Sequence, residues 1–223
     1  MLTNITTQLL LNLILFFIIL ILLPIFYLKF FRKKTNQEII NELIPKQKKI
    51  SIELIGSIKL FLILFLFNII FSLIFSYLSI QFGLPIGDSE KVSQEIMPLI
   101  TGNTFLFLLV IIFMALFEEI FFRAFLLKRF KNIFNFIFEK LKITNKSNKI
   151  SLVKIITFLS IIFSSVIFSL GHIDYNSNAE LLAAFLLGII LAYWFNKNNS
   201  IYQNYLGHLF FNLFVIFLLI ISM

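Results

Sequence analysis

Two adjacent glutamates and an arginine stand inside a stretch that is otherwise apolar, residues 104–127. Glu119 and Arg123 are four residues apart, acid first, so on a helix they share one face as a favourable ion pair. Glu118 lies about 100° further round the helix and has no such local partner. Adjacent carboxylates disfavour each other's ionisation, so this pair is suited to exchange a proton with water or substrate.

Charges in such a stretch need compensation, because each one at the centre of a membrane costs about 2.5–3.5 kcal/mol. One interpretation is a salt bridge that locks helices together. The other is a functional site, since ionisable residues inside membranes commonly mark substrate, ion or proton pathways.

The sequence contains only two histidines, and both also lie in apolar stretches. His172 ends one stretch, with Phe168 one helical turn before it. His208 and Asn212 share a helical face in the last stretch. Alone, these residues are explained as an interfacial histidine and a hydrogen-bonded helix contact. Together with the glutamates they provide a base, proton shuttles and oxyanion donors, the groups that peptide hydrolysis requires.

Other protease chemistries find no residues to carry them. The sequence has no cysteine, no His-Glu-x-x-His zinc motif and no Gly-x-Ser-Gly serine motif. Its only aspartates, Asp88 and Asp174, fall between predicted helices, where they form no buried aspartyl pair. A glutamate-based site is what remains.

Long apolar stretches must position these groups, and the composition requires a lipid environment for them. Hydrophobic residues make up 60% of the 223 residues, and the mean hydropathy is +0.99. We predict an all-α polytopic transmembrane bundle of about six spans and reject a β-barrel, which would alternate polar and apolar residues. The predicted spans are residues 9–28, 60–80, 104–127, 152–172, 179–196 and 204–222. We expect residues 1–100 to hold N-terminal helices and an external loop, and residues 101–223 to hold a catalytic core, the two forming a single membrane domain.

Basic residues predict the orientation of the bundle. Residues 29–59 and residues 128–154 contain eight Lys or Arg each, whereas the connection at 83–101 contains one. Positive loops stay in the cytoplasm, so we expect a cell-membrane protein with both termini extracytoplasmic. The first apolar stretch is too long for a signal peptide and is expected to be a retained span. The net charge of +8 is assigned to topology and lipid contact, not to nucleic-acid binding.

An amphipathic pattern follows the third predicted span. Apolar residues recur at helical spacing over residues 130–141, with polar residues opposite. Two interpretations fit equally: a helix lying in the cytoplasmic interface, or a cytoplasmic extension of the third span.

The ordered motifs resemble the CAAX protease and bacteriocin-processing family of intramembrane peptidases, often called the Abi family. Its pattern is Glu-Glu-x-x-x-Arg, then Phe-x-x-x-His, then His-x-x-x-Asn on separate helices, and the resemblance covers residues 118–212. It implies that Glu118 is the general base that activates water on a peptide bond, and that Glu119 and Arg123 orient the site. It further implies the remaining roles: His172 positions water or substrate, and His208 and Asn212 donate hydrogen bonds to the oxyanion.

The resemblance leaves alternatives open. No cofactor is expected, because Asn212 is a poor zinc ligand and a good oxyanion donor, but zinc on Glu118, His172 and His208 is an alternative. A bacteriocin-immunity or binding protein of the same fold could dispense with catalysis. A proton-coupled transporter would use the glutamate pair as its carrier. The partners expected for the peptidase are membrane lipid and a peptide or protein substrate, without nucleic acid.

Depth counting raises one conflict among these residues. At about 1.5 Å per residue, Glu119 lies about 22 Å from the outer edge of its span, a depth that His208 shares. A straight fourth span that starts near Ile155 carries His172 about 25 Å toward the outside. Convergence requires a strong tilt, a broken third helix or a deeper start of the fourth span.

Overall fold

The computed structural model describes residues 2–83, 97–141, 149–173 and 177–221, and all regular structure within these ranges is helical. Six of its helices are long and apolar enough to cross a membrane. The prediction of an all-α polytopic bundle is confirmed. Asp88 and Asp174 lie outside the described residues.

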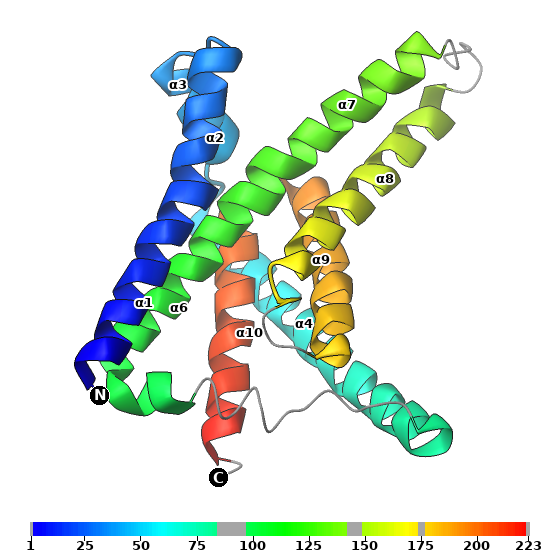
Figure 1. Cartoon of the computed structure of the whole chain (residues 1–223). Coiled ribbons are helices and arrows are strands. Elements are labelled where there is room, and N and C mark those ends of the chain that lie inside the picture. Colours follow the sequence, from blue (N-terminus) through cyan, green and yellow to red (C-terminus); the bar gives the residue numbers. More distant parts are fainter. Residues whose placement is uncertain (1, 84–96, 142–148, 174–176, 222–223) are drawn as a thin grey trace.

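The helices follow one another in the order of the predicted spans (Figure 1). The first span comprises α1 (Leu2–Phe17), η1 (Ile18–Leu22), α2 (Leu23–Phe26) and η2 (Tyr27–Phe31), and the short helix α3 (Asn36–Leu43) follows it. The second span is α4 (Ile50–Phe82). The third comprises α6 (Thr104–Glu118), η3 (Glu119–Leu126) and α7 (Leu127–Lys140). The last three spans are α8 (Lys149–Leu170), α9 (Asn178–Asn198) and α10 (Ile201–Ile221).

The second span starts ten residues earlier than predicted. Charged residues near its beginning, Glu53 and Lys59, made residues 50–59 look like part of a cytoplasmic connection. In the structure Glu53 is buried and hydrogen-bonded, so its charge does not end the helix. Helix α4 therefore continues over 33 residues.

The third helix runs without a break from Thr104 to Lys140. Of the two interpretations of residues 130–141, the structure shows the extension of the third span. The rings of Phe130 and Phe134 on α7 contact the ring of Phe163 on α8, with centroids 5.6 and 5.3 Å apart. Helices α7 and α8 consequently form an antiparallel hairpin that extends the bundle at the end opposite the termini (Figure 1).

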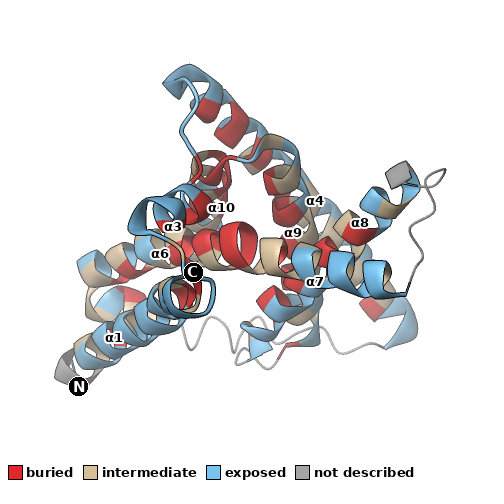
Figure 2. Ribbon diagram, turned by 90° about the horizontal axis from the view of Figure 1, so that it is seen from above, coloured by how far each residue is buried: buried red, intermediate tan, exposed pale blue. Residues whose placement is uncertain are grey.

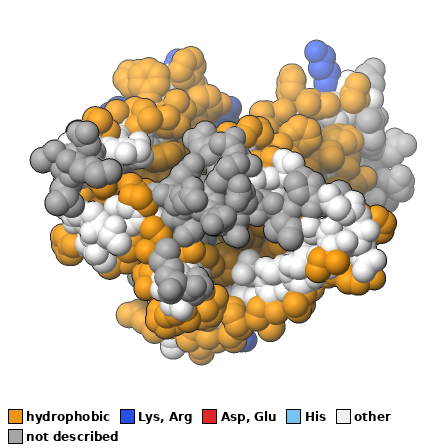
Figure 3. Space-filling model, turned by 60° about the horizontal axis from the view of Figure 1, so that its bottom comes forward, with side chains coloured by type: hydrophobic (Ala, Val, Ile, Leu, Met, Phe, Trp, Pro, Cys, Tyr) orange, Lys and Arg blue, Asp and Glu red, His pale blue; other side chains and the backbone are white. Residues whose placement is uncertain are grey.

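Helix α10 lies at the centre of the arrangement and packs against α4, α6, α9 and η3. Helix α1 covers α6, and α8 lies between α7 and α9. Figure 2 shows buried residues gathered toward the middle of the bundle, whereas α7 and the outer face of α1 are largely exposed. Among the side chains that are coloured by type in Figure 3, apolar ones predominate, as expected for helices that lie against lipid.

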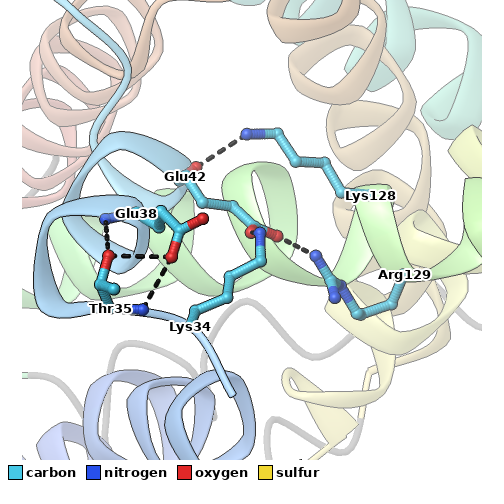
Figure 4. A network of polar contacts seen from close by, with 6 residues as sticks. All are labelled: Lys34, Thr35, Glu38, Glu42, Lys128 and Arg129. Carbon is cyan, nitrogen blue, oxygen red and sulfur yellow. Dashed lines mark hydrogen bonds and ion pairs between the residues drawn. The ribbon is translucent and has the colours of Figure 1, made fainter. Parts of the chain in front are cut away.

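A polar cluster fixes α3 against the third helix (Figure 4). The carboxylate of Glu42 pairs with Lys34 and Arg129, and the Lys128 ammonium donates to the Glu42 carbonyl at 2.7 Å. At the other end of α3, the Thr35 backbone N–H and hydroxyl donate to Glu38, which holds the pKa of that carboxyl below its usual value. This cap and the Glu42 pairs define where the connection between the first two spans meets the core.

Candidate active site

Glu119 is the centre of a buried polar cluster between η3 and α10. His208 Nδ1 lies 2.9 Å from Glu119 Oε1, and Asn204 Nδ2 donates to Oε2 at 3.0 Å. Arg123 Nε lies 3.3 Å from the same Oε2, as the four-residue spacing predicts. Glu119 and Arg123 are fully buried. Both oxygens of Glu119 are thus occupied by protein groups.

The helix changes its winding at this carboxylate. Residues Glu119–Leu126 form a π-helical segment, η3, whose wider turn is frequent at functional sites. The segment is held from outside, because Ser164 on α8 donates its hydroxyl to the Phe122 carbonyl at 2.8 Å. The π-helical turn alters the angular relation between Glu118 and the residues that follow it, which α-helical spacing alone does not predict.

Glu118 is placed differently from its neighbour. Its side chain keeps 17% exposure, and its Oε2 lies 3.9 Å from His208 Nε2. That distance is too long for a direct hydrogen bond. An ionised carboxylate can only accept, so Glu119 places the proton of His208 on Nδ1 and directs Nε2 toward Glu118. One imidazole therefore connects a buried carboxylate to an accessible one.

Arg123 is balanced by charge and by aromatic faces. Its guanidinium carbon lies 4.6 Å from the Phe168 ring centroid and 5.8 Å from that of Phe122. Among the described residues, its guanidinium nitrogens have no hydrogen-bond partner besides the ion pair with Glu119. The pair and the two rings are what compensate this buried charge.

His172 approaches the cluster through Phe168. Its Nδ1 donates to the Phe168 carbonyl at 3.0 Å, and the two rings are 4.9 Å apart at their centroids. The same phenylalanine ring lies 6.1 Å from the ring of His208. Phe168 thus lies beside both histidines and under Arg123.

The conflict in depth is resolved by a deeper start of the fourth helix. Helix α8 begins at Lys149, six residues before the expected start near Ile155. Ser164 contacts the Phe122 carbonyl, so Phe168 and His172 lie one and two turns past the level of Phe122, in the direction of Glu118. The fourth span therefore brings Phe168 next to Arg123 and His208 without a break in the third helix, and His172 lies beside Phe168.

Asn212 does not join the cluster. It is half-buried on α10, one turn beyond His208. No hydrogen bond within the described ranges involves its side chain.

Asn204 belongs to the cluster, although it was not among the site residues predicted from the sequence. It lies one turn before His208 on α10, is fully buried, and donates to Glu119 and also to the Leu191 carbonyl of α9 at 2.8 Å. The sequence did contain a sign of its role, because Asn204 is a further asparagine in the same apolar helix and stands four residues before His208.

In the described part of the chain, no three His, Cys, Asp or Glu side chains are grouped to hold an ion. Glu119 is committed to three protein donors, and His208 Nδ1 faces that carboxylate. No step below is derived through a metal.

The fold and this cluster define a multi-pass membrane protein with carboxylate, guanidinium and imidazole groups buried among its spans. A family model, described as type II CAAX prenyl endopeptidase Rce1-like, matches residues 100–214, more than half of the 223 residues and all six predicted site residues. The chain belongs to this family of CAAX endopeptidase-like hydrolases, and the resemblance inferred from the motifs is confirmed. No curated protein and no solved structure matches the chain significantly.

Proposed function

We propose that this protein is an intramembrane peptidase in which Glu118 activates the water that hydrolyses a peptide bond. The observation that carries the proposal is the position of His208 between two carboxylates. Glu119 holds one nitrogen of its ring at 2.9 Å, and the other nitrogen faces Glu118 across 3.9 Å. A water or substrate oxygen between Glu118 and Nε2 would contact both groups.

In the proposed reaction, the Glu118 carboxylate removes a proton from water as the water oxygen bonds to the carbonyl carbon of the substrate. The carbonyl oxygen becomes an oxyanion. Glu118 then transfers the proton to the peptide nitrogen, the C–N bond breaks, and an amine and a carboxylic acid leave. Glu118 thus acts first as a general base and then as a general acid.

The other residues stabilise that oxyanion and the site around it. A protonated His208 would donate from Nε2, and Glu119 would stabilise the imidazolium and hold its orientation. Asn212 is proposed as the second donor, since its amide is not used in the buried cluster. His172, next to Phe168, is proposed to position water or substrate.

The substrate class follows from the family description. We propose a membrane-associated peptide, with a prenylated CAAX tail as the first substrate to examine. The two basic connections meet the bundle at the end opposite the termini (Figure 1). This arrangement supports the proposal that those connections face the cytoplasm and that both termini lie outside a cell membrane.

The direct test compares two glutamates in proteoliposomes. Glu118→Gln should abolish cleavage of a prenylated CAAX peptide, measured by mass spectrometry of the fragments. Glu139→Gln, the same change at an exposed position of α7, should leave cleavage unchanged. Undiminished cleavage by the Glu118 variant would contradict the mechanism.

A further inference from the structure

A second buried carboxylate lies outside the candidate active site. Glu53, near the start of α4, is only 2% exposed. Its Oε1 accepts the Lys48 backbone N–H at 2.8 Å, and its Oε2 accepts the Ser200 hydroxyl at 2.6 Å. Ser200 is 147 residues away in sequence, so this carboxylate joins the entrance of α4 to the connection between α9 and α10.

Ser200 is also the N-cap of α10. Its hydroxyl oxygen accepts the Gln203 backbone N–H at 3.2 Å, the usual cap interaction at the third helical residue. One buried hydroxyl therefore donates to Glu53 and accepts from the first turn of α10. The position at which α10 starts is fixed by a side chain of α4.

The Gln203 carboxamide fixes the same turn from two further directions. Its Oε1 accepts Trp194 Nε1–H from α9 at 3.1 Å, and its Nε2 donates to the Ile52 carbonyl of α4 at 3.4 Å. The carboxamide lies against Gly56, where an added Cβ would be 2.2 Å from Gln203 Cδ. Helix α10 can neither slide nor rotate here without breaking these contacts.

Two residues of the candidate active site lie on α10 shortly after this first turn. Asn204 and His208 lie one and two turns after Ser200, the latter about 12 Å along the axis. Both hold Glu119, and His208 also sets the distance to Glu118. A shift of α10 at Ser200 would be transmitted along the helix to the imidazole, because helices move as rigid units over two turns.

We infer that Glu53 is a positioning residue for the candidate active site: through Ser200 and Gln203 it sets the register of α10, and thereby the placement of His208 between the two glutamates. The kinetic consequence rests on the proposed peptidase function. The placement of His208 does not, so the two can be tested separately.

The experiment uses histidine as its own probe. Full-length protein labelled with ¹⁵N in the histidine rings gives signals from two residues, because the chain has only two histidines. The variant His172→Gln assigns them. Ser200→Ala removes the hydroxyl that joins Glu53 to α10, and Glu53→Gln changes the acceptor itself. Ser160→Ala is the matched control, since Ser160 is equally buried but, among the described residues, its hydroxyl bonds only to the Ile156 carbonyl of its own helix.

We expect the His208 ring signals to shift in Ser200→Ala and Glu53→Gln while those of His172 stay in place, and Ser160→Ala to change neither. Cleavage should show a kcat at least about tenfold lower with KM nearly constant, as for a misplaced catalytic group. If Glu53→Gln does not fold, Ser200→Ala decides alone. His208 signals that match the wild type, or an equal shift in Ser160→Ala, would overturn the inference. If the wild-type protein itself cleaves no peptide, a shift of the His208 signals in the variants would still uphold the positioning role, and the missing cleavage would count against the peptidase function.

Discussion

Glu119 Oε1 and His208 Nδ1 lie 2.9 Å apart in a contact that joins η3 to α10 across 89 residues of sequence. The contact is buried and has Arg123 on its other side. It couples the charge balance of the third helix to the orientation of the imidazole. We therefore expect the stability of the protein and the proposed activity to depend on the same carboxylate.

Glu119→Gln tests the stability part of this coupling. The variant leaves the Arg123 guanidinium buried without its counter-charge, which should lower the free energy of unfolding by about 3–5 kcal/mol. The measurement is a denaturant titration of the protein in detergent micelles. Glu118→Gln is the control: its carboxylate is partly exposed and lies 3.9 Å from its imidazole neighbour, so its unfolding should change much less. Equal losses for the two variants would contradict the separate roles assigned to the glutamates.

Asn204→Ala tests the residue that the motifs did not indicate. It removes donors to Glu119 and to the Leu191 carbonyl, so we expect a loss of about 1–3 kcal/mol in the free energy of unfolding together with reduced cleavage. Asn212→Ala, on the same helix and half-buried, should change stability by less than about 0.5 kcal/mol and lower kcat alone. Denaturant titrations and single-turnover cleavage separate these outcomes. A stable Asn204 variant would show that the carboxamide bonds contribute little.

The sequence predicted the spans well because hydrocarbon imposes length and apolarity on each helix. It also predicted the Glu119–Arg123 pair, since both residues lie on one helix with known geometry. It placed the start of α4 too late, because a glutamate in an apolar setting looks like a boundary until its partners are known. Glu53 finds those partners in Lys48 and in Ser200, and only the latter is distant in sequence.

Contacts between helices could not be predicted from the sequence. Which carboxylate His208 contacts depends on the rotation of α10, which is set by packing against α4 and α9. The depth of His172 depends on where α8 starts in its hairpin with α7, and the π-helical turn after Glu118 is a local departure from regular spacing. Asn204 was visible as an asparagine one turn from His208, but its role required the position of Leu191 on a neighbouring helix.

Metal removal distinguishes the glutamate mechanism from a zinc enzyme. The Glu119 carboxylate is occupied by His208 and Asn204, and the proposed reaction uses Glu118 without a metal, so we expect cleavage to continue undiminished after treatment with a strong chelator. Metal content measured on the treated protein is the control for complete removal. Activity that disappears with the metal and returns with added zinc would favour ligation by Glu118, His172 and His208 instead.

Gly188→Ala tests whether Phe168 places the two histidines. A Cβ at position 188 on α9 would lie 3.1 Å from Phe168 Cδ1 and 3.1 Å from Ser165 Cβ, so the ring and the serine must each give by a few tenths of an ångström. We expect a loss of about 1–3 kcal/mol in stability, as for other overpacked contacts, and weaker cleavage because the ring supports Arg123 and lies beside His172.

The double variant Gly188→Ala with Phe168→Leu isolates the cause of that loss. The smaller leucine removes the ring that meets the added methyl group. The pair should then be more stable than the sum of the two single changes indicates, by more than about 0.5 kcal/mol. Cleavage should not recover, because leucine offers no aromatic face to the Arg123 guanidinium. Strictly additive stabilities would show that the alanine acts through Ser165 and not through the ring, and recovered cleavage would show that Phe168 only fills space.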